Sequence, residues 1–176
     1  NGSHYTNYPP INQLCFLIAA LFASKSIYSA IIVLKIIIIS ADIGILYIGT
    51  KLLKRMHLPI KNIFWYVLNP FIIIEMTGNL HFEPVMIFFL VWSLLALHKK
   101  QWIWAAILLA CAISVKLIPL LLLPLFYQWF VKNNQNWLKG FVKLNLFYTI
   151  VLSTTLLLFL PFYTSELIEN YSNSLS

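Results

Sequence analysis

The chain has 176 residues, of which 61% are hydrophobic and only 10% are charged, and its formal net charge is +7. Soluble domains are about half apolar and about a quarter charged, so this composition excludes an ordinary water-soluble fold and predicts a protein dissolved in lipid. The basic residues lie in short clusters between apolar runs. That pattern orients membrane proteins, so we expect no nucleic-acid partner.

Apolar runs follow one another along the chain and are long enough to predict membrane helices, since a span needs about 20 such residues. We predict an all-α, polytopic membrane helix bundle with about six crossings and one interfacial helix. The first run, 11–23, has only thirteen residues and lies between proline and serine residues, so we expect it to lie in the membrane interface. The predicted crossings are 27–50, 60–76, 84–98, 102–115, 117–131 and 141–160.

Three gaps between these runs hold nine of the twelve basic residues and none of the five acidic ones: 51–61, 98–101 and 132–143. By the positive-inside rule these gaps are cytoplasmic. The chain must therefore cross the membrane an even number of times between consecutive gaps. Segment 60–76 runs outward and 84–98 returns, so the turn between them is expected at the outer face.

The run 102–131 is predicted to be a hairpin. A single straight helix over this range would be about 45 Å long and would end on the wrong side of the membrane. It would also place Lys116 in the middle of the bilayer. An outer apex at 114–119 avoids both problems, and Pro119 and Pro124 are suited to a helix start and a broken helix.

Polar residues therefore gather at the outer face, in the turn G-N-L-H-F-E-P (78–84) and at the Lys116 apex. Lys116 is predicted either to hold the phosphate of a lipid-linked substrate or to extend its ammonium group to the lipid headgroups. His81 and Glu83 are candidates to orient a sugar hydroxyl or a phosphate oxygen, or to act as general base. Asn79 is suited to sugar recognition. The alternative for His81 and Glu83 is a solvated loop, which is the more common setting of a lone histidine, and the alternative for Asn79 is an ordinary turn asparagine.

Two further charged residues lie inside the run 27–50. Lys35 and Asp42 are seven residues apart, which places them two turns apart on one helical face. Charged groups this deep in an apolar run need partners. We predict a structural ion pair instead of a proton relay, because a relay needs more than one buried carboxylate.

No metal-ligand spacing connects the four histidines and two cysteines, so no metal site and no cofactor is expected, and dependence on a divalent metal stays open.

Several short motifs occur in a characteristic order: Tyr8-Pro9-Pro10, K-I-I-I-I-S-A-D, L-N-P, G-N-L-H-F-E and S-V-K-L-I-P-L-L-L-L-P-L. Together they resemble the integral-membrane glycosyltransferases of the GT-C superfamily, most of all the polyprenol-phosphate-mannose-dependent mannosyltransferases and their bacterial relatives. The resemblance covers nearly the whole chain.

The resemblance implies transfer of mannose or another hexose from a polyprenyl-phosphate donor to a hydroxyl of a glycan or lipid acceptor at the periplasmic or luminal face. Lys116 matches a lysine that contacts the donor phosphate, and His81 and Asn79 match a polar outer loop. The family's catalytic base is a carboxylate in a loop upstream of Asn1. The chain therefore resembles the middle of such an enzyme and is expected to be inactive by itself.

A transporter or lipid flippase is the alternative function, suggested by the prolines within the apolar runs and by Lys35 and Asp42. The one-sided clustering of polar residues and the absence of a detectable repeat favour the glycosyltransferase. Ile, Lys and Asn usage favours a bacterial inner membrane over the endoplasmic reticulum.

Overall fold

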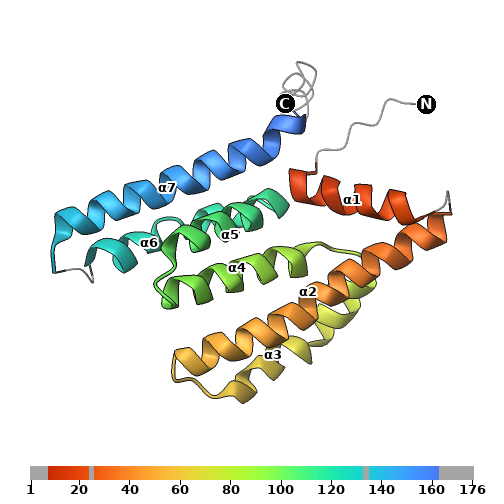
Figure 1. Cartoon of the computed structure of the whole chain (residues 1–176). Coiled ribbons are helices and arrows are strands. Elements are labelled where there is room, and N and C mark those ends of the chain that lie inside the picture. Colours follow the sequence, from red (N-terminus) through yellow and green to blue (C-terminus); the bar gives the residue numbers. More distant parts are fainter. Residues whose placement is uncertain (1–7, 24–25, 133–134, 163–176) are drawn as a thin grey trace.

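The protein is helical throughout the part of the chain that the structure describes. The structure is a computed structural model that describes residues 8–23, 26–132 and 135–162, and these ranges contain no β-strand. Figure 1 shows the longer helices packed alongside one another, with the start of the first and the end of the last close together. The longer helices are α1 (Pro10–Phe22), α2 (Ile27–Arg55), α4 (Glu83–His98), α5 (Trp102–Val115) and α7 (Trp137–Phe159).

Two of the predicted membrane segments are interrupted helices. The first consists of a 3-10 turn, Ile60–Ile63, the short helix α3, Phe64–Val67, and a π-helix, Ile72–Gly78. Pro70 explains the break after α3, since proline disfavours the helical conformation of the residue before it.

The second interrupted segment follows Lys116. It comprises a 3-10 helix, Ile118–Leu122, the short helix α6, Leu125–Tyr127, and a π-helix, Gln128–Lys132. Pro124 lies at the break between the 3-10 helix and α6, where it lacks the amide hydrogen that a continuing helix needs. Pro119 lies in the first turn of the 3-10 helix, a position that tolerates proline.

The six predicted crossings are not confirmed. Within the described residues, only Ile27–Arg55 and Trp137–Phe162 are long and apolar enough to cross a membrane by themselves. A third span is possible if the π-helix and α4, which meet at a bend of 109°, are counted as one. Helices α4 and α5 have 16 and 14 residues, fewer than the roughly 20 that a perpendicular span needs. The all-helical fold is shown, whereas the number of crossings stays a prediction.

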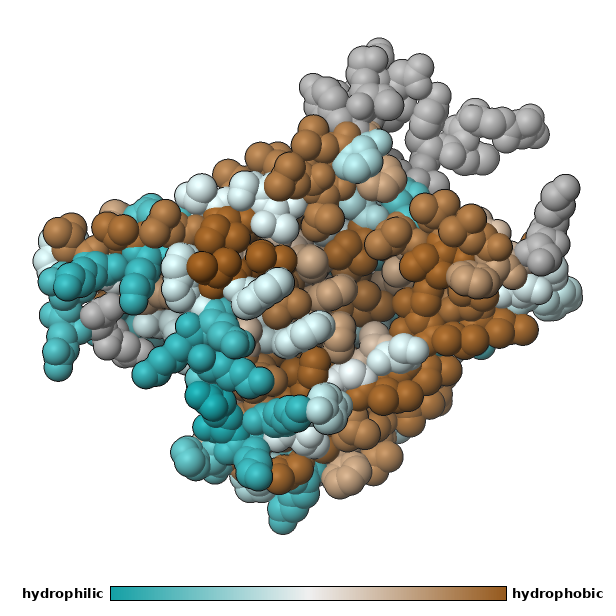
Figure 2. Space-filling view, viewed as in Figure 1, coloured by the Kyte–Doolittle hydropathy of each residue, from teal (hydrophilic) through white to brown (hydrophobic). Residues whose placement is uncertain are grey.

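The flanks of the three basic gaps lie together at one end of the molecule. The guanidinium of Arg55 donates to the carbonyl oxygen of His98 at 2.7 Å, and the His98 ring contacts Trp129 with a centroid distance of 4.8 Å. Gly140 of α7 packs against the backbone of Phe130. Figure 2 shows hydrophilic side chains gathered at the end where α2 finishes and α7 begins, with hydrophobic side chains over much of the remaining face. The side of the membrane on which this end lies stays a prediction.

Helix α5 is the centre of the bundle and packs closely on α4. Four alanines of α5 are fully buried: Ala105, Ala106, Ala110 and Ala112. Small side chains let helix backbones approach one another, which is how helices associate in lipid. The hydroxyl of Ser93 in α4, also fully buried, donates to the carbonyl oxygen of Ala105 at 2.7 Å. Helices α4 and α5 therefore form a rigid pair, which fixes the positions of the residues at their ends.

Gly140 should be intolerant of even a methyl group. A Cβ added there would lie 2.3 Å from the carbonyl oxygen of Phe130 and 3.0 Å from the Cα of Val131, both backbone atoms. We expect Gly140→Ala to lower the free energy of unfolding by about 1–3 kcal/mol, because α7 has to move away. Thermal unfolding in detergent measures the change.

Gly49→Ala is the matched control, since its added Cβ meets only the end of the Ile63 side chain, which can rotate. Equal stability of the two variants would contradict the close backbone approach at Gly140.

Candidate functional site

A sharp turn at the end opposite the basic gaps carries most of the candidate residues. The π-helix ends at Gly78, and the chain passes through Leu80 in the left-handed region, with φ of 60°. The amide of His81 donates to the carbonyl oxygen of Met76 at 2.9 Å and closes the turn. Helix α4 then starts at Glu83, with Pro84 in its first turn, where proline's missing amide hydrogen costs nothing.

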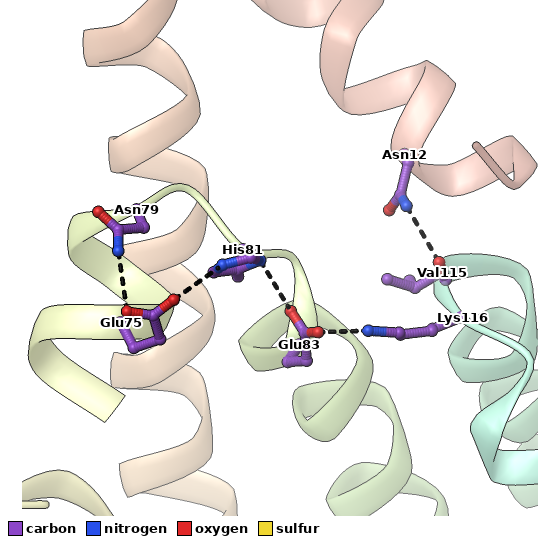
Figure 3. A network of polar contacts seen from close by, with 7 residues as sticks. All are labelled: Asn12, Glu75, Asn79, His81, Glu83, Val115 and Lys116. Carbon is purple, nitrogen blue, oxygen red and sulfur yellow. Dashed lines mark hydrogen bonds and ion pairs between the residues drawn. The ribbon is translucent and has the colours of Figure 1, made fainter. Parts of the chain in front are cut away.

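The polar side chains of this turn form a chain of contacts that ends at Lys116 (Figure 3). The amide of Asn79 donates to Oε2 of Glu75 at 2.9 Å, and Nε2 of His81 lies 3.4 Å from Oε1 of the same carboxylate. Nδ1 of His81 lies 3.9 Å from Oε2 of Glu83, whose other oxygen accepts a hydrogen bond from the Lys116 ammonium. An imidazole thus lies between two carboxylates.

Lys116 reaches this turn because α5 stops just before it. Val115 is the last residue of α5, and Lys116 is extended, with φ of −155° and ψ of 140°. Its side chain is 48% exposed, whereas that of Glu83 is 20% exposed. The lysine is therefore paired but still accessible to a ligand.

These residues line one cavity of about 270 Å³. The walls come from three parts of the chain: the start of α1, the turn before α4, and the end of α5. Its lining residues are Tyr8, Pro9, Asn12, Leu80, His81, Phe82, Glu83, Val115 and Lys116. The cavity combines an ammonium, a carboxylate, an imidazole and an amide, which can bind a phosphate and hydroxyl groups together.

The charge state of Glu83 follows from its neighbours. Glu83 precedes the predicted membrane segment 84–98, so its carboxylate lies at the edge of the apolar region. Burial by itself raises its pKa, but the hydrogen bond from Lys116, a backbone hydrogen bond at Glu83 itself, the charge of Lys116 and a smaller contribution from His81 together outweigh burial and leave the pKa below its ordinary value. Glu83 is thus a carboxylate at neutral pH and holds the Lys116 ammonium in the cavity.

The structure brings together all four candidate residues of the outer face: Lys116, His81, Asn79 and Glu83. Sequence reasoning did not assign a site role to Glu75, which connects Asn79 to His81. Glu75 and Asn79 are four residues apart, a spacing that places two side chains on one helical face and was visible in the sequence. The substrate-binding roles of all these residues stay predictions.

Lys35 and Asp42 are not brought together. The carboxylate of Asp42 accepts hydrogen bonds from the Tyr66 hydroxyl at 3.2 Å and from the Thr77 hydroxyl at 2.9 Å. The ion pairs found among the described residues do not include one between Lys35 and Asp42. Asp42 instead attaches both halves of the interrupted segment to α2, and Lys35 is exposed on the surface of α2.

In the described part of the chain, no group of three or more His, Cys, Asp or Glu side chains is placed to hold a metal ion.

A comparison with protein families assigns residues 3–132, about three quarters of the chain, to one family. The matching family model is described as "Alpha-(1->6)-mannopyranosyltransferase, N-terminal domain". Comparisons with curated proteins and with solved structures found no match. The matched range contains α1, the turn before α4, and Lys116, and therefore every residue that lines the cavity. The chain belongs to the alpha-(1->6)-mannopyranosyltransferase family, whose members are mannose-transferring glycosyltransferases.

Proposed function

We propose that the chain forms the donor-binding part of a membrane mannosyltransferase that takes mannose from a polyprenyl phosphate at the outer face of the membrane. The observation that carries the proposal is the shared cavity, in which the Lys116 ammonium, His81 and Glu83 converge at one end of an apolar bundle. A polyprenyl-phosphate sugar has a matching form, with an anionic phosphate and a hydroxyl-rich sugar on an apolar chain.

In the proposed reaction an acceptor hydroxyl oxygen forms a bond to the anomeric carbon of mannose while the bond from that carbon to the phosphate oxygen breaks. The leaving phosphate keeps the electron pair, and the acceptor proton goes to a carboxylate. The resemblance to the GT-C glycosyltransferases implies that this carboxylate lies in a loop upstream of Asn1. Lys116 stabilises the charge that develops on the leaving phosphate. Glu83 holds the ammonium in place until the phosphate replaces or shares that contact.

Donor use tests the proposal directly. Membranes that contain the full-length protein are incubated with polyprenyl-phosphate mannose or with a nucleotide-linked mannose, in sealed vesicles and with a lipid or glycan acceptor. We expect mannosylated acceptor only with the polyprenyl donor. Product from the nucleotide donor alone would overturn the proposed donor, and movement of lipid across the bilayer without any glycosidic product would instead support a flippase.

The side of the membrane is tested separately by cysteine labelling. In a chain whose own cysteines are replaced by alanine, Asn79→Cys should react with an impermeant thiol reagent from the periplasmic or luminal side. Both Asn79 and Lys99 are exposed, so Lys99→Cys serves as the matched control and should react only after the membrane is opened. Labelling of both positions from the same side would contradict the predicted topology.

A further inference from the structure

Asn12 of α1 is a buried polar residue with a long-range contact. It is 4% exposed, and its side-chain amide donates to the carbonyl oxygen of Val115 at 3.0 Å, across 103 residues of sequence. Figure 3 shows this hydrogen bond beside the chain of contacts that ends at Lys116. Asn12 also lines the cavity. It is therefore the point at which α1 is attached to the end of α5.

The contact acts on the peptide unit that carries Lys116. The carbonyl group of Val115 and the amide nitrogen of Lys116 belong to one planar peptide group, so the hydrogen bond from Asn12 fixes the orientation of that plane. Lys116 is extended, so the Val115 carbonyl lies at a helix end, where the last carbonyl groups have no partner within the helix. A side chain from α1 supplies the donor, and the backbone of Lys116 is held in the extended conformation.

Helix α1 also packs against the turn that carries Glu83, the ion-pair partner of Lys116. The ring of Phe16 packs on Phe82, the residue before Glu83, with a centroid distance of 5.4 Å. The ring of Tyr8 packs on Phe16 at 5.3 Å. One short helix thus contacts the backbone of Lys116 on one side and the turn that carries Glu83 on the other.

Stability alone does not explain an asparagine at this position. Within the described residues, Oδ1 of Asn12 is buried without a hydrogen-bond partner. A buried acceptor without a partner destabilises a fold, and replacing it with an apolar side chain of similar shape is often neutral or favourable. The favourable contribution of Asn12 therefore comes from its side-chain amide, which donates to the Val115 carbonyl.

We propose that Asn12 is a positioning residue for mannosyl transfer, which sets the orientation of Lys116 in the cavity. This inference rests on the proposed role of Lys116 as the contact for the donor phosphate. Without the Asn12 hydrogen bond the Lys116 peptide is free to rotate, and the ammonium loses its place beside Glu83.

A double-mutant cycle in the full-length enzyme tests whether Asn12 acts through Lys116. We expect Asn12→Ala to lower kcat/KM for the polyprenyl-phosphate donor by about 10- to 100-fold, the range for a misplaced group near the reaction. In a Lys116→Ala background the same change should have little further effect, because the two residues form one unit. Equal losses in both backgrounds would overturn the positioning role.

Ser114→Ala is the matched control. The Ser114 hydroxyl is also buried without a partner among the described residues, but it does not line the cavity. Its removal should leave transfer unchanged. A loss equal to that of Asn12→Ala would mean that any change in this buried layer disturbs the site, which contradicts a specific role for Asn12.

The pH dependence of the Asn12→Asp variant distinguishes loss of the hydrogen bond from a general loosening of the packing, which predicts no such pH dependence. A protonated carboxyl can donate to the Val115 carbonyl, whereas a carboxylate cannot. Burial raises the pKa of a carboxyl group, so the protonated form becomes more populated as the pH falls. The activity of Asn12→Asp relative to the wild type should rise as the pH is lowered from 8 towards about 5. A ratio that is independent of pH would argue against the hydrogen bond as the cause.

Thiol labelling separates this inference from the proposed function, because it needs no catalysis. In a chain whose own cysteines are replaced by alanine, Lys116→Cys should react faster with a water-soluble thiol reagent when Asn12→Ala is also present. Lys99→Cys, far from α1, should react equally in both backgrounds and so reports general loosening. Faster labelling, combined with no transfer from the polyprenyl donor by the chain that keeps Lys116, would retain the positioning role and reject the donor. An unchanged rate at residue 116 would overturn the positioning role.

Discussion

Lys116→Ala is expected to lower mannosyl transfer from the polyprenyl donor by about 100- to 1,000-fold, the loss that follows removal of one group that stabilises developing charge. The ammonium lies in the cavity beside the Glu83 carboxylate and is 48% exposed. Its removal leaves Glu83 as an unopposed negative charge where the donor phosphate is proposed to bind. Both the missing cation and the repulsion weaken the transition state. Initial rates with purified full-length enzyme at saturating acceptor measure the effect.

The fold should tolerate this change, because a half-exposed ion pair contributes little to stability. Lys116→Arg should recover part of the rate, since it restores the charge with a different geometry. Lys99→Ala is the control for loss of one exposed lysine at the other end of the molecule and should keep full activity. A wild-type rate for Lys116→Ala would contradict the proposal that Lys116 stabilises the leaving phosphate.

Phe147→Ala should be the most destabilising single truncation in the bundle. Phe147 of α7 is fully buried, and its ring contacts Phe126, Phe130 and Tyr148 at centroid distances of 4.8, 5.2 and 6.2 Å. We expect a loss of about 3 kcal/mol in the free energy of unfolding, the lower end for Phe→Ala in a close-packed core, since lipid chains already surround the unfolded helices. The midpoint of a denaturing-detergent titration measures it.

Leu152→Ala is the matched comparison, because Leu152 lies on the same helix but is 62% exposed. Its truncation should change stability little, since its side chain faces lipid in both the native and the separated state. If Leu152→Ala and Phe147→Ala were equally destabilising, the assigned interior and exterior faces of α7 would be wrong.

The helical class was predictable because apolar runs of this length leave the backbone only its own hydrogen bonds. The number of membrane crossings was harder to predict from the sequence than the helical class. Prolines divided 60–76 and 117–131 into short helical pieces, and whether such pieces cross a membrane depends on what packs around them.

The candidate site was predictable in outline. Alternation of basic gaps and apolar runs indicated that the turn at 78–84 and Lys116 share one face, and the structure places Glu83 and Lys116 in contact. Asn12 was missed because one polar residue in an apolar helix carries no local signal of what it binds. Its partner, the Val115 carbonyl, is 103 residues away.

The sequence by itself determined that the chain is helical, that its apolar surface requires lipid, and that its polar residues concentrate at one face, because hydropathy, charge and proline act locally along the chain. Only the tertiary structure decided the pairings. Asp42 bonds to Tyr66 and Thr77 and makes no described ion pair with Lys35, although the helical spacing of the two charges allowed one. A charged group takes the partner that packing brings nearest, and packing depends on contacts between segments far apart in sequence.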